Sequence, residues 1–170
     1  MVVEDGTGLV NADSFCSLDF ADEYFETRAN SLWTGTDDAK EAAIIRASDY
    51  IEQRWSHRFK GEKQFPDNPQ SLSFPRLYIE ADDSVPLGVK RACAEYALRA
   101  LSGELAPDAS YDSNGQSLSR KRTKVGPIET DLTYTQGGTG STAPTFRPYP
   151  AADAWLRPYL LSSGGNRVIR

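Results

Sequence analysis

Apolar residues recur at helical spacing in three stretches of the first 106 residues, and the most regular stretch covers residues 84–105. Apolar side chains return there every three or four positions and charged ones take the opposite side, which predicts an amphipathic helix. Ser84 and Pro86 suit its first turn, and Gly103 suits a left-handed residue at its end. Its apolar face is mostly small: Val89, Ala92, Cys93, Tyr96, Ala97, Ala100 and Leu101. We expect either a plain core helix or one that also contacts a neighbouring subunit.

Two earlier stretches show the same spacing, with local signals for where each helix begins. Ser17 is a suitable N-cap for a helix over residues 18–28. Thr36 and the two aspartates after it open a second helix that ends near Trp55. Alanine is abundant in the second and third helices, so their backbones can approach closely. The chain is therefore predicted to be mainly α, with a small helical bundle as its core.

The regular spacing ends between residues 56 and 83, where glycine and proline recur. Loops of this length are usually functional. Apolar residues within it are expected to pin it to the bundle: Leu72, Phe74, Leu77, Tyr78 and Ile79. His57, the single histidine, has arginine and lysine as neighbours, so we interpret it as a solvated surface residue.

A different pattern follows the third helix. Residues 117–125 and 128–135 alternate polar and apolar positions on either side of Gly126-Pro127, which predicts a β-hairpin. One strand is basic, with Arg120, Lys121, Arg122 and Lys124, and the other is acidic, with Glu129 and Asp131. Opposite charges can therefore meet across the pair. Because an isolated two-stranded hairpin is marginally stable in water, this one is predicted to need a partner sheet or subunit.

The C-terminal residues combine a short helix with an extended tail. Pro150 is suited to begin the helix, whose apolar face carries Trp155, Leu156, Tyr159 and Leu160. After a glycine-containing joint, Val168 and Ile169 lie between two arginines. This tail is either a strand that docks on another chain or a frayed terminus. The predicted organisation is a helical bundle core over 1–106, a connector with hairpin and flexible loop over 107–149, and a C-terminal helix with docking tail over 150–170.

Charge is unevenly distributed along the 170 residues, whose formal net charge is −5. From residue 118 onward there are eight lysines and arginines against three acids, a net charge of +5. The preceding residues carry eleven basic and twenty-one acidic side chains, a net charge of −10. An acidic body with a basic end suits head-to-tail contact between subunits, or a surface that meets a polyanion.

The sequence offers no set of residues for catalysis. Cys16 and Cys93 have no histidine positioned to activate them, and we interpret both as small buried apolar residues. The paired aspartates are better explained as helix caps than as a carboxylate dyad or a metal site. The glycine-rich run after residue 136 lacks the Gly-Lys-Ser/Thr ending of a phosphate-binding loop. We therefore expect no enzyme activity, no metal and no cofactor, and the absence of a long apolar run predicts no contact with a membrane.

The basic strand of the hairpin is the candidate surface for nucleic acid. Lysine and arginine bind phosphate regardless of sequence, and the affinity falls as salt rises. However, no aromatic residues lie among these cations to stack on bases, and the acidic strand offsets part of their charge. A surface that lies near DNA is favoured over one that binds it tightly.

Six segments of the chain form a familiar pattern, in this order: VEDGTGLVNADSF, DDAKEAAIIRASDYIEQRW, QSLSFPR, VPLGVKRACAEYALRAL, KVGPIETDLTY and PAADAWLRPYL. Together they resemble one family of tailed-bacteriophage proteins, the head–tail connector (adaptor) group, some members of which are labelled DnaT-like single-stranded DNA-binding proteins.

This resemblance implies a structural protein that forms a closed ring of about twelve copies under the portal. The ring would extend the DNA channel and join capsid to tail, with the portal, a tail or stopper/terminator connector and its own copies as partners. Genomic DNA would pass through without sequence-specific contact. The chain would lie at the neck of the virion after assembly in the host cytoplasm.

The resemblance also implies roles for particular residues. The hairpin, with Arg120, Lys121, Arg122, Lys124, Glu129 and Asp131, would join neighbouring subunits or face the channel. The residues expected to dock on the portal are Trp155, Leu156, Tyr159, Arg167, Val168, Ile169 and Arg170. The alternative function is single-stranded DNA binding during phage replication, which would require aromatic residues among basic ones.

Overall fold

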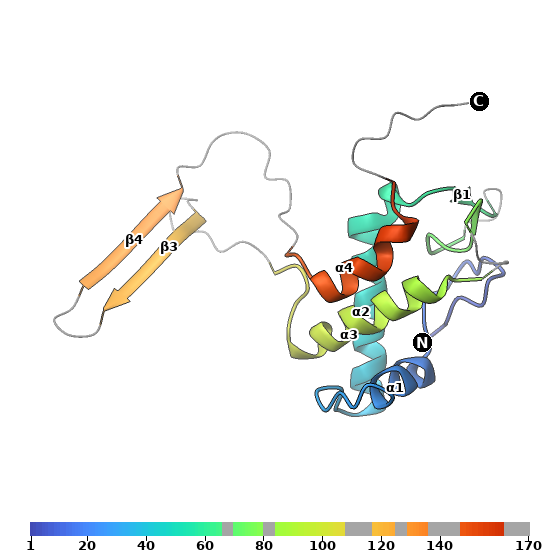
Figure 1. Cartoon of the computed structure of the whole chain (residues 1–170), viewed down its shortest axis with the longest axis horizontal. Coiled ribbons are helices and arrows are strands. Elements are labelled where there is room, and N and C mark those ends of the chain that lie inside the picture. Colours follow the sequence, from blue (N-terminus) through green and yellow to red (C-terminus); the bar gives the residue numbers. More distant parts are fainter. Residues whose placement is uncertain (66–69, 80–83, 108–116, 125–128, 136–146, 162–170) are drawn as a thin grey trace. The chain divides into compact units, whose positions relative to one another are not determined.

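The computed structural model describes residues 1–65, 70–79, 84–107, 117–124, 129–135 and 147–161 (Figure 1). The chain divides into two units, one formed by Met1–Leu105 with Arg147–Arg170 and the other by Ala106–Phe146. The described residues are mainly helical, with a short antiparallel hairpin, as the spacing of apolar residues predicts. The C-terminal helix belongs to the first unit, whereas the sequence suggests a separate C-terminal segment.

The described residues of the first unit form four α-helices. They are α1 (Leu18–Glu26), α2 (Asp37–Trp55), α3 (Leu87–Ser102) and α4 (Pro150–Leu156). Three of them, α1, α2 and α4, begin where the sequence predicts. The Ser17 side chain accepts a hydrogen bond from the Phe20 backbone N–H at 3.2 Å, and Thr36 accepts one from Ala39 at 3.3 Å. These bonds satisfy backbone donors that an uncapped helix leaves unpaired, so both predicted N-caps are confirmed.

The sequence correctly predicts that α3 ends at Gly103, but not how either end of the helix is capped. The helix begins after Pro86, and Ser84 makes no capping bond to it. Pro86 lacks an N–H and fixes its own φ, which suffices to start a helix without a side-chain cap. Gly103 has a φ of 164°, which is extended backbone and not the left-handed conformation expected of it.

Small residues let α3 pack between α2 and α4. Ala43 and Ala47 of α2 and Ala92 and Ala97 of α3 are all completely buried. α3 contacts α2 and α4, and Figure 1 shows it alongside both. At Gly88 a Cβ atom would lie 2.6 Å from the ring of Tyr159. The close approach of α3 to the C-terminal segment therefore depends on a residue without a side chain.

The segment between α2 and α3 is partly regular. It contains the 3-10 turn η1 (Ser56–Arg58) and the two-residue strands β1 (Glu62–Lys63) and β2 (Arg76–Leu77), which pair antiparallel. Of the apolar residues expected to pin it, Leu72 and Phe74 are buried, but Leu77 is 40% and Tyr78 89% exposed. The prediction is wrong for these last two, which lie on and directly after β2 with their side chains in solvent, and Ile79 is half-buried. His57 is exposed, as predicted.

Two buried carboxylates hold the loops of this unit through backbone groups. Glu4, which is 2% exposed, accepts bonds from the N–H groups of Gly6, Gly8 and Leu9 at 2.9–3.0 Å. Glu52 accepts bonds from the backbone N–H and hydroxyl of Ser73 at 2.7 and 2.8 Å. Burial raises the pKa of Glu52, and the two bonds from Ser73 oppose that rise. Both carboxylates thus have structural partners.

The second unit contains the predicted hairpin. Strands β3 (Ser117–Lys124) and β4 (Glu129–Thr135) pair antiparallel, with an irregularity between Leu118 and Arg120. The register places Arg122 opposite Asp131 and Lys124 opposite Glu129. The basic and acidic positions of the two strands therefore do face one another in register.

Candidate functional site

The residues expected to dock on a portal fall into two groups. Trp155, Leu156 and Tyr159 lie on α4 and on the 3-10 turn η2 (Arg157–Tyr159) that follows it. Leu156 is completely buried, so it contributes to the core of the first unit, whereas Trp155 and Tyr159 are half-buried. The other expected docking residues lie outside the described part of the chain: Arg167, Val168, Ile169 and Arg170.

The six hairpin residues all lie on described strands of the second unit. Arg120, Lys121, Arg122 and Lys124 are on β3, and Glu129 and Asp131 are on β4. The structure gives their register and places them in a different unit from α4. The hairpin and docking residues are therefore not parts of one site within either unit.

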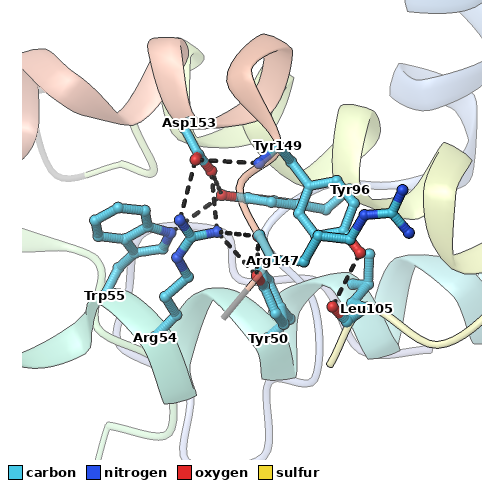
Figure 2. Close-up of polar contacts among 8 residues, drawn as sticks. All are labelled: Tyr50, Arg54, Trp55, Tyr96, Leu105, Arg147, Tyr149 and Asp153. Atoms are coloured by element: carbon cyan, nitrogen blue, oxygen red, sulfur yellow. Dashed lines mark hydrogen bonds and ion pairs between the residues drawn. The ribbon is translucent and has the colours of Figure 1, made fainter. Parts of the chain in front are cut away.

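A buried polar network holds α4 against α2 and α3 (Figure 2). Arg54 of α2 donates to both carboxylate oxygens of Asp153 on α4, at 3.2 and 3.0 Å. The hydroxyl of Tyr96 on α3 donates to the same carboxylate, and Trp55 Nε1 donates to that hydroxyl at 3.1 Å. Burial, reinforced by Asp153, raises the pKa of Tyr96, so its hydroxyl keeps its proton. Each group in this network has a partner, so the network fastens a helix and exposes no reactive atom.

The same network fixes the segment that leads into α4. The Arg147 carbonyl accepts bonds from the Tyr50 hydroxyl at 3.2 Å and from Arg54 at 3.1 Å. The Tyr149 backbone N–H donates to Asp153 at 3.2 Å, and its hydroxyl donates to the Leu105 carbonyl at 2.9 Å (Figure 2). Leu105 and Arg147, the residues directly before and after the hairpin unit, are thereby bonded within the helical unit.

A cleft of about 190 Å³ lies between α1 and α3. Its lining combines aromatic, aliphatic and charged side chains, namely Phe20, Glu23, Tyr24, Thr27, Arg28, Leu87 and Arg91. Leu87 is 51% exposed, so its side chain adds apolar surface to the cleft. The cleft therefore offers apolar surface and positive charge at one place.

Two arginines of this cleft lie against aromatic rings. The Arg28 guanidinium carbon lies 3.6 Å from the centroid of the Tyr24 ring, and that of Arg91 lies 4.8 Å from the Trp155 ring. The rings of Phe20 and Tyr24 are 22° from parallel, with centroids 6.3 Å apart. The Arg28–Tyr24 and Arg91–Trp155 contacts have the geometry of cation–π interactions. Trp155, which the sequence assigns to docking, is thus placed by α4 next to Arg91, at the edge of the cleft and not in its lining.

The polar groups behind the cleft are paired. The Tyr24 hydroxyl donates to Glu95 at 3.0 Å, and Arg99 forms an ion pair with Glu95 at 2.6 Å. Burial, followed by the negative charge of Glu95, raises the pKa of Tyr24. The charge of Glu95 is therefore offset by Arg99, and the net charge at the cleft comes from Arg28 and Arg91 against Glu23.

The sequence does not reveal this cleft, because its lining residues come from two helices that are far apart in the chain and the neighbouring Trp155 comes from a third. One local signal was available. Phe20, Tyr24 and Arg28 follow one another at intervals of four, which places them on one face of a helix. The spacing alone does not reveal that Arg91 and Trp155 lie beside that face.

Neither a metal-binding cluster nor a membrane-spanning helix occurs among the residues that the structure describes. In that part of the chain no group of three histidine, cysteine, aspartate or glutamate side chains is arranged to hold a metal ion. None of the helices found there is both long and apolar enough to cross a membrane. Cys16 and Cys93 are free and buried, as predicted.

These observations define a mainly α protein with a helical unit, a separate β-hairpin unit and a cleft lined by arginine and aromatic residues. A family model described as "Putative DnaT-like ssDNA binding protein" matches residues 1–170, so the chain belongs to that family. No curated protein and no solved structure matches the chain. The comparison thus supports the DnaT-like label; it provides no support for the head–tail connector label.

Proposed function

We propose that this protein binds single-stranded DNA through its helical unit. The arginine–aromatic cleft between α1 and α3 is the observation that carries the proposal. It places arginine next to aromatic rings, whereas the basic strand β3 has cations without aromatic residues among them. The description of the family, whose model spans the whole chain, supports the same function.

The cleft has the chemistry that single-stranded DNA requires. Arginine binds backbone phosphate, and an aromatic side chain that stacks on a base contributes about 1–3 kcal/mol. Arg28 and Arg91 supply the first interaction, and the rings of Phe20 and Trp155 are available for the second. Because the residues before 118 have a net charge of −10, attraction to DNA is local to such clusters. Binding is therefore moderate in strength and sensitive to salt.

The β-hairpin is the weaker candidate for the DNA-binding surface. Its register sets Arg122 against Asp131 and Lys124 against Glu129, so acidic positions offset half of its four basic ones. We therefore assign its basic strand to contact with protein.

Fluorescence anisotropy of labelled oligothymidylate and of a duplex of the same length tests this function. The wild-type protein is expected to prefer the single strand, and its affinity is expected to fall as salt rises. No binding at low salt, or equal binding to the duplex, would contradict the proposal.

A head–tail connector is the second candidate function, and the two-unit organisation favours it. An isolated two-stranded hairpin is marginally stable, so β3 and β4 need support from another chain. In this proposal about twelve copies form a ring under the portal at the virion neck, after assembly in the host cytoplasm. The portal docks on the C-terminal segment, a tail or stopper/terminator connector binds the opposite face, and genomic DNA passes through.

Light scattering with and without the portal protein, followed by electron microscopy, tests the connector. A ring, alone or on the portal, is the expected result. Deletion of residues 162–170 should leave the protein folded but unable to join the portal, because only the expected docking tail is lost. A protein that stays monomeric with the portal present, or a truncated protein that still attaches, would count against this candidate.

A further inference from the structure

We propose that the cleft between α1 and α3 binds one nucleotide of single-stranded DNA, with the phosphate on Arg28 and Arg91 and the base against Phe20 and Trp155. This assignment rests on the proposed single-stranded DNA binding and names its site. The juxtaposition of two guanidinium groups with rings from α1 and α4 is the observation behind it.

The charge of the cleft favours a phosphate. Arg28 and Arg91 both line it, and Glu23 is the one acid among its lining residues. Among the described residues, the ion pairs involve neither of these arginines, while Glu95 behind the cleft is already paired with Arg99. Two cations without an acidic partner, on an otherwise acidic body, form a local site for an anion. The planar guanidinium group also matches the geometry of phosphate oxygens.

The rings of the cleft favour a base next to that phosphate. Arg91 lies 4.8 Å from the Trp155 centroid, at the distance of a cation–π contact that a base could replace by stacking. Trp155 is half-buried, so part of its ring is open to solvent. Phe20 is also half-buried, and its ring lies nearly parallel to that of Tyr24. Stacking on such rings is tolerant of sequence because every base has a π-face.

The size of the cleft limits its occupant. Its volume of about 190 Å³ is below the roughly 300–1,000 Å³ of sites that enclose drug-sized ligands. A cleft of this volume suits one base better than a dinucleotide. Bases in a duplex are stacked on one another and cannot enter such a cleft without being unstacked, so the site selects single strands.

The test compares the double variant Arg28→Gln/Arg91→Gln with the wild-type chain, by anisotropy of labelled oligothymidylate over a salt series. We expect at least about tenfold weaker binding, because two charge-assisted bonds are lost. The slope of log affinity against log salt should become shallower by about 0.7, the value for one phosphate contact on a single strand. Both arginines are at least partly exposed, and circular dichroism with thermal melting checks that the variant folds.

Two control variants make the result specific. Arg46→Gln/Arg157→Gln removes the same charge from two exposed arginines away from the cleft and should bind like wild type. Changing the four basic residues of β3 to serine should also leave affinity within about twofold, because the site lies in the helical unit. If either control loses as much affinity as the Arg28/Arg91 double variant, the assignment is overturned.

Intrinsic fluorescence provides a second readout that reports the base. Trp33 and Trp55 are 8% and 7% exposed, whereas Trp155 is half-buried, so stacking should quench Trp155 selectively. Quenching by oligothymidylate that disappears in Trp155→Phe is the expected result. Quenching that persists in this variant would contradict contact between the base and Trp155.

The outcomes separate this inference from the function on which it rests. If wild type binds single strands and the double variant binds equally well, the cleft assignment fails and the function stands. If wild type binds no single strand, the function fails and the assignment fails with it. If the double variant loses self-association but keeps its DNA affinity, the cleft is a contact between copies of this chain, and the assignment is again overturned.

Discussion

Asp153 is the residue whose loss should most weaken the attachment of α4. Its carboxylate accepts two bonds from Arg54 and one from Tyr96, and it also accepts the Tyr149 backbone N–H. The Arg54 and Asp153 side chains are 12% and 16% exposed, and Tyr96 is completely buried. Replacement by asparagine removes the negative charge while keeping the shape of the side chain. Arg54 then remains largely buried without its counter-charge.

The size of this effect follows from the burial of the pair. Breaking a buried ion pair by removing one partner costs about 3–5 kcal/mol. Asparagine still offers an oxygen to accept one bond, so we expect Asp153→Asn to lower the free energy of unfolding by about 2–3 kcal/mol. At a few degrees per kcal/mol for a unit of this size, the melting temperature should fall by about 8 °C.

Thermal and urea denaturation followed by circular dichroism measure this loss, and Asp22→Asn is the matched control. Asp22 also accepts bonds from a tryptophan and a cation, Trp33 and Lys40, but its side chain is 42% exposed. An exposed pair contributes about 1 kcal/mol or less, so the control should be much milder. A change below about 0.5 kcal/mol for Asp153→Asn, or equal effects of the two variants, would refute the argument that burial makes this network stabilising.

Three further variants test other parts of the account. Gly88→Ala should lower the free energy of unfolding by about 1–3 kcal/mol in urea denaturation, because the new Cβ would lie 2.6 Å from the Tyr159 ring; an unchanged midpoint would contradict the close approach. Ser17→Ala should cost about 1 kcal/mol in the same assay, because it removes the cap on the Phe20 N–H, and a neutral effect would show that the cap is dispensable. The pKa of Tyr96 is raised in the folded state, so its contribution to stability is present below about pH 10, where a tyrosine in the unfolded chain begins to ionise, and falls above it. Between about pH 10 and 11, just above the ordinary tyrosine pKa, the free energy of unfolding should therefore fall less in Tyr96→Phe than in wild type. Equal falls in the two proteins would contradict this.

Local features of the sequence predicted the helices and the hairpin. A capping residue acts within one turn, so Ser17 and Thr36 identify the starts of α1 and α2 without any tertiary information. Alternation similarly identifies β3 and β4, because side chains of a strand point to opposite faces in turn. The start of α3 was misplaced because Pro86 begins that helix without help from Ser84.

The candidate sites depended on contacts between distant segments and could not be predicted in the same way. Apolar spacing on α4 indicates a face that must be buried, but not what covers it, so Leu156 was expected at a docking surface and is instead in the core. The network around Asp153 and the arginine–aromatic cleft each combine residues from three helices. Packing of α3 between α2 and α4 brings them together, and that packing is a property of the folded unit.

The measurement that tests the central claim most directly is the affinity of the wild-type protein for oligothymidylate, with unlabelled duplex as competitor. The account predicts a complex with the single strand that excess duplex does not displace and that weakens as salt rises, with a slope of about −0.7 from the one phosphate held in the cleft. A protein that ignores the single strand at low salt, or that duplex displaces as readily as an unlabelled single strand does, would contradict single-stranded DNA binding and favour the connector.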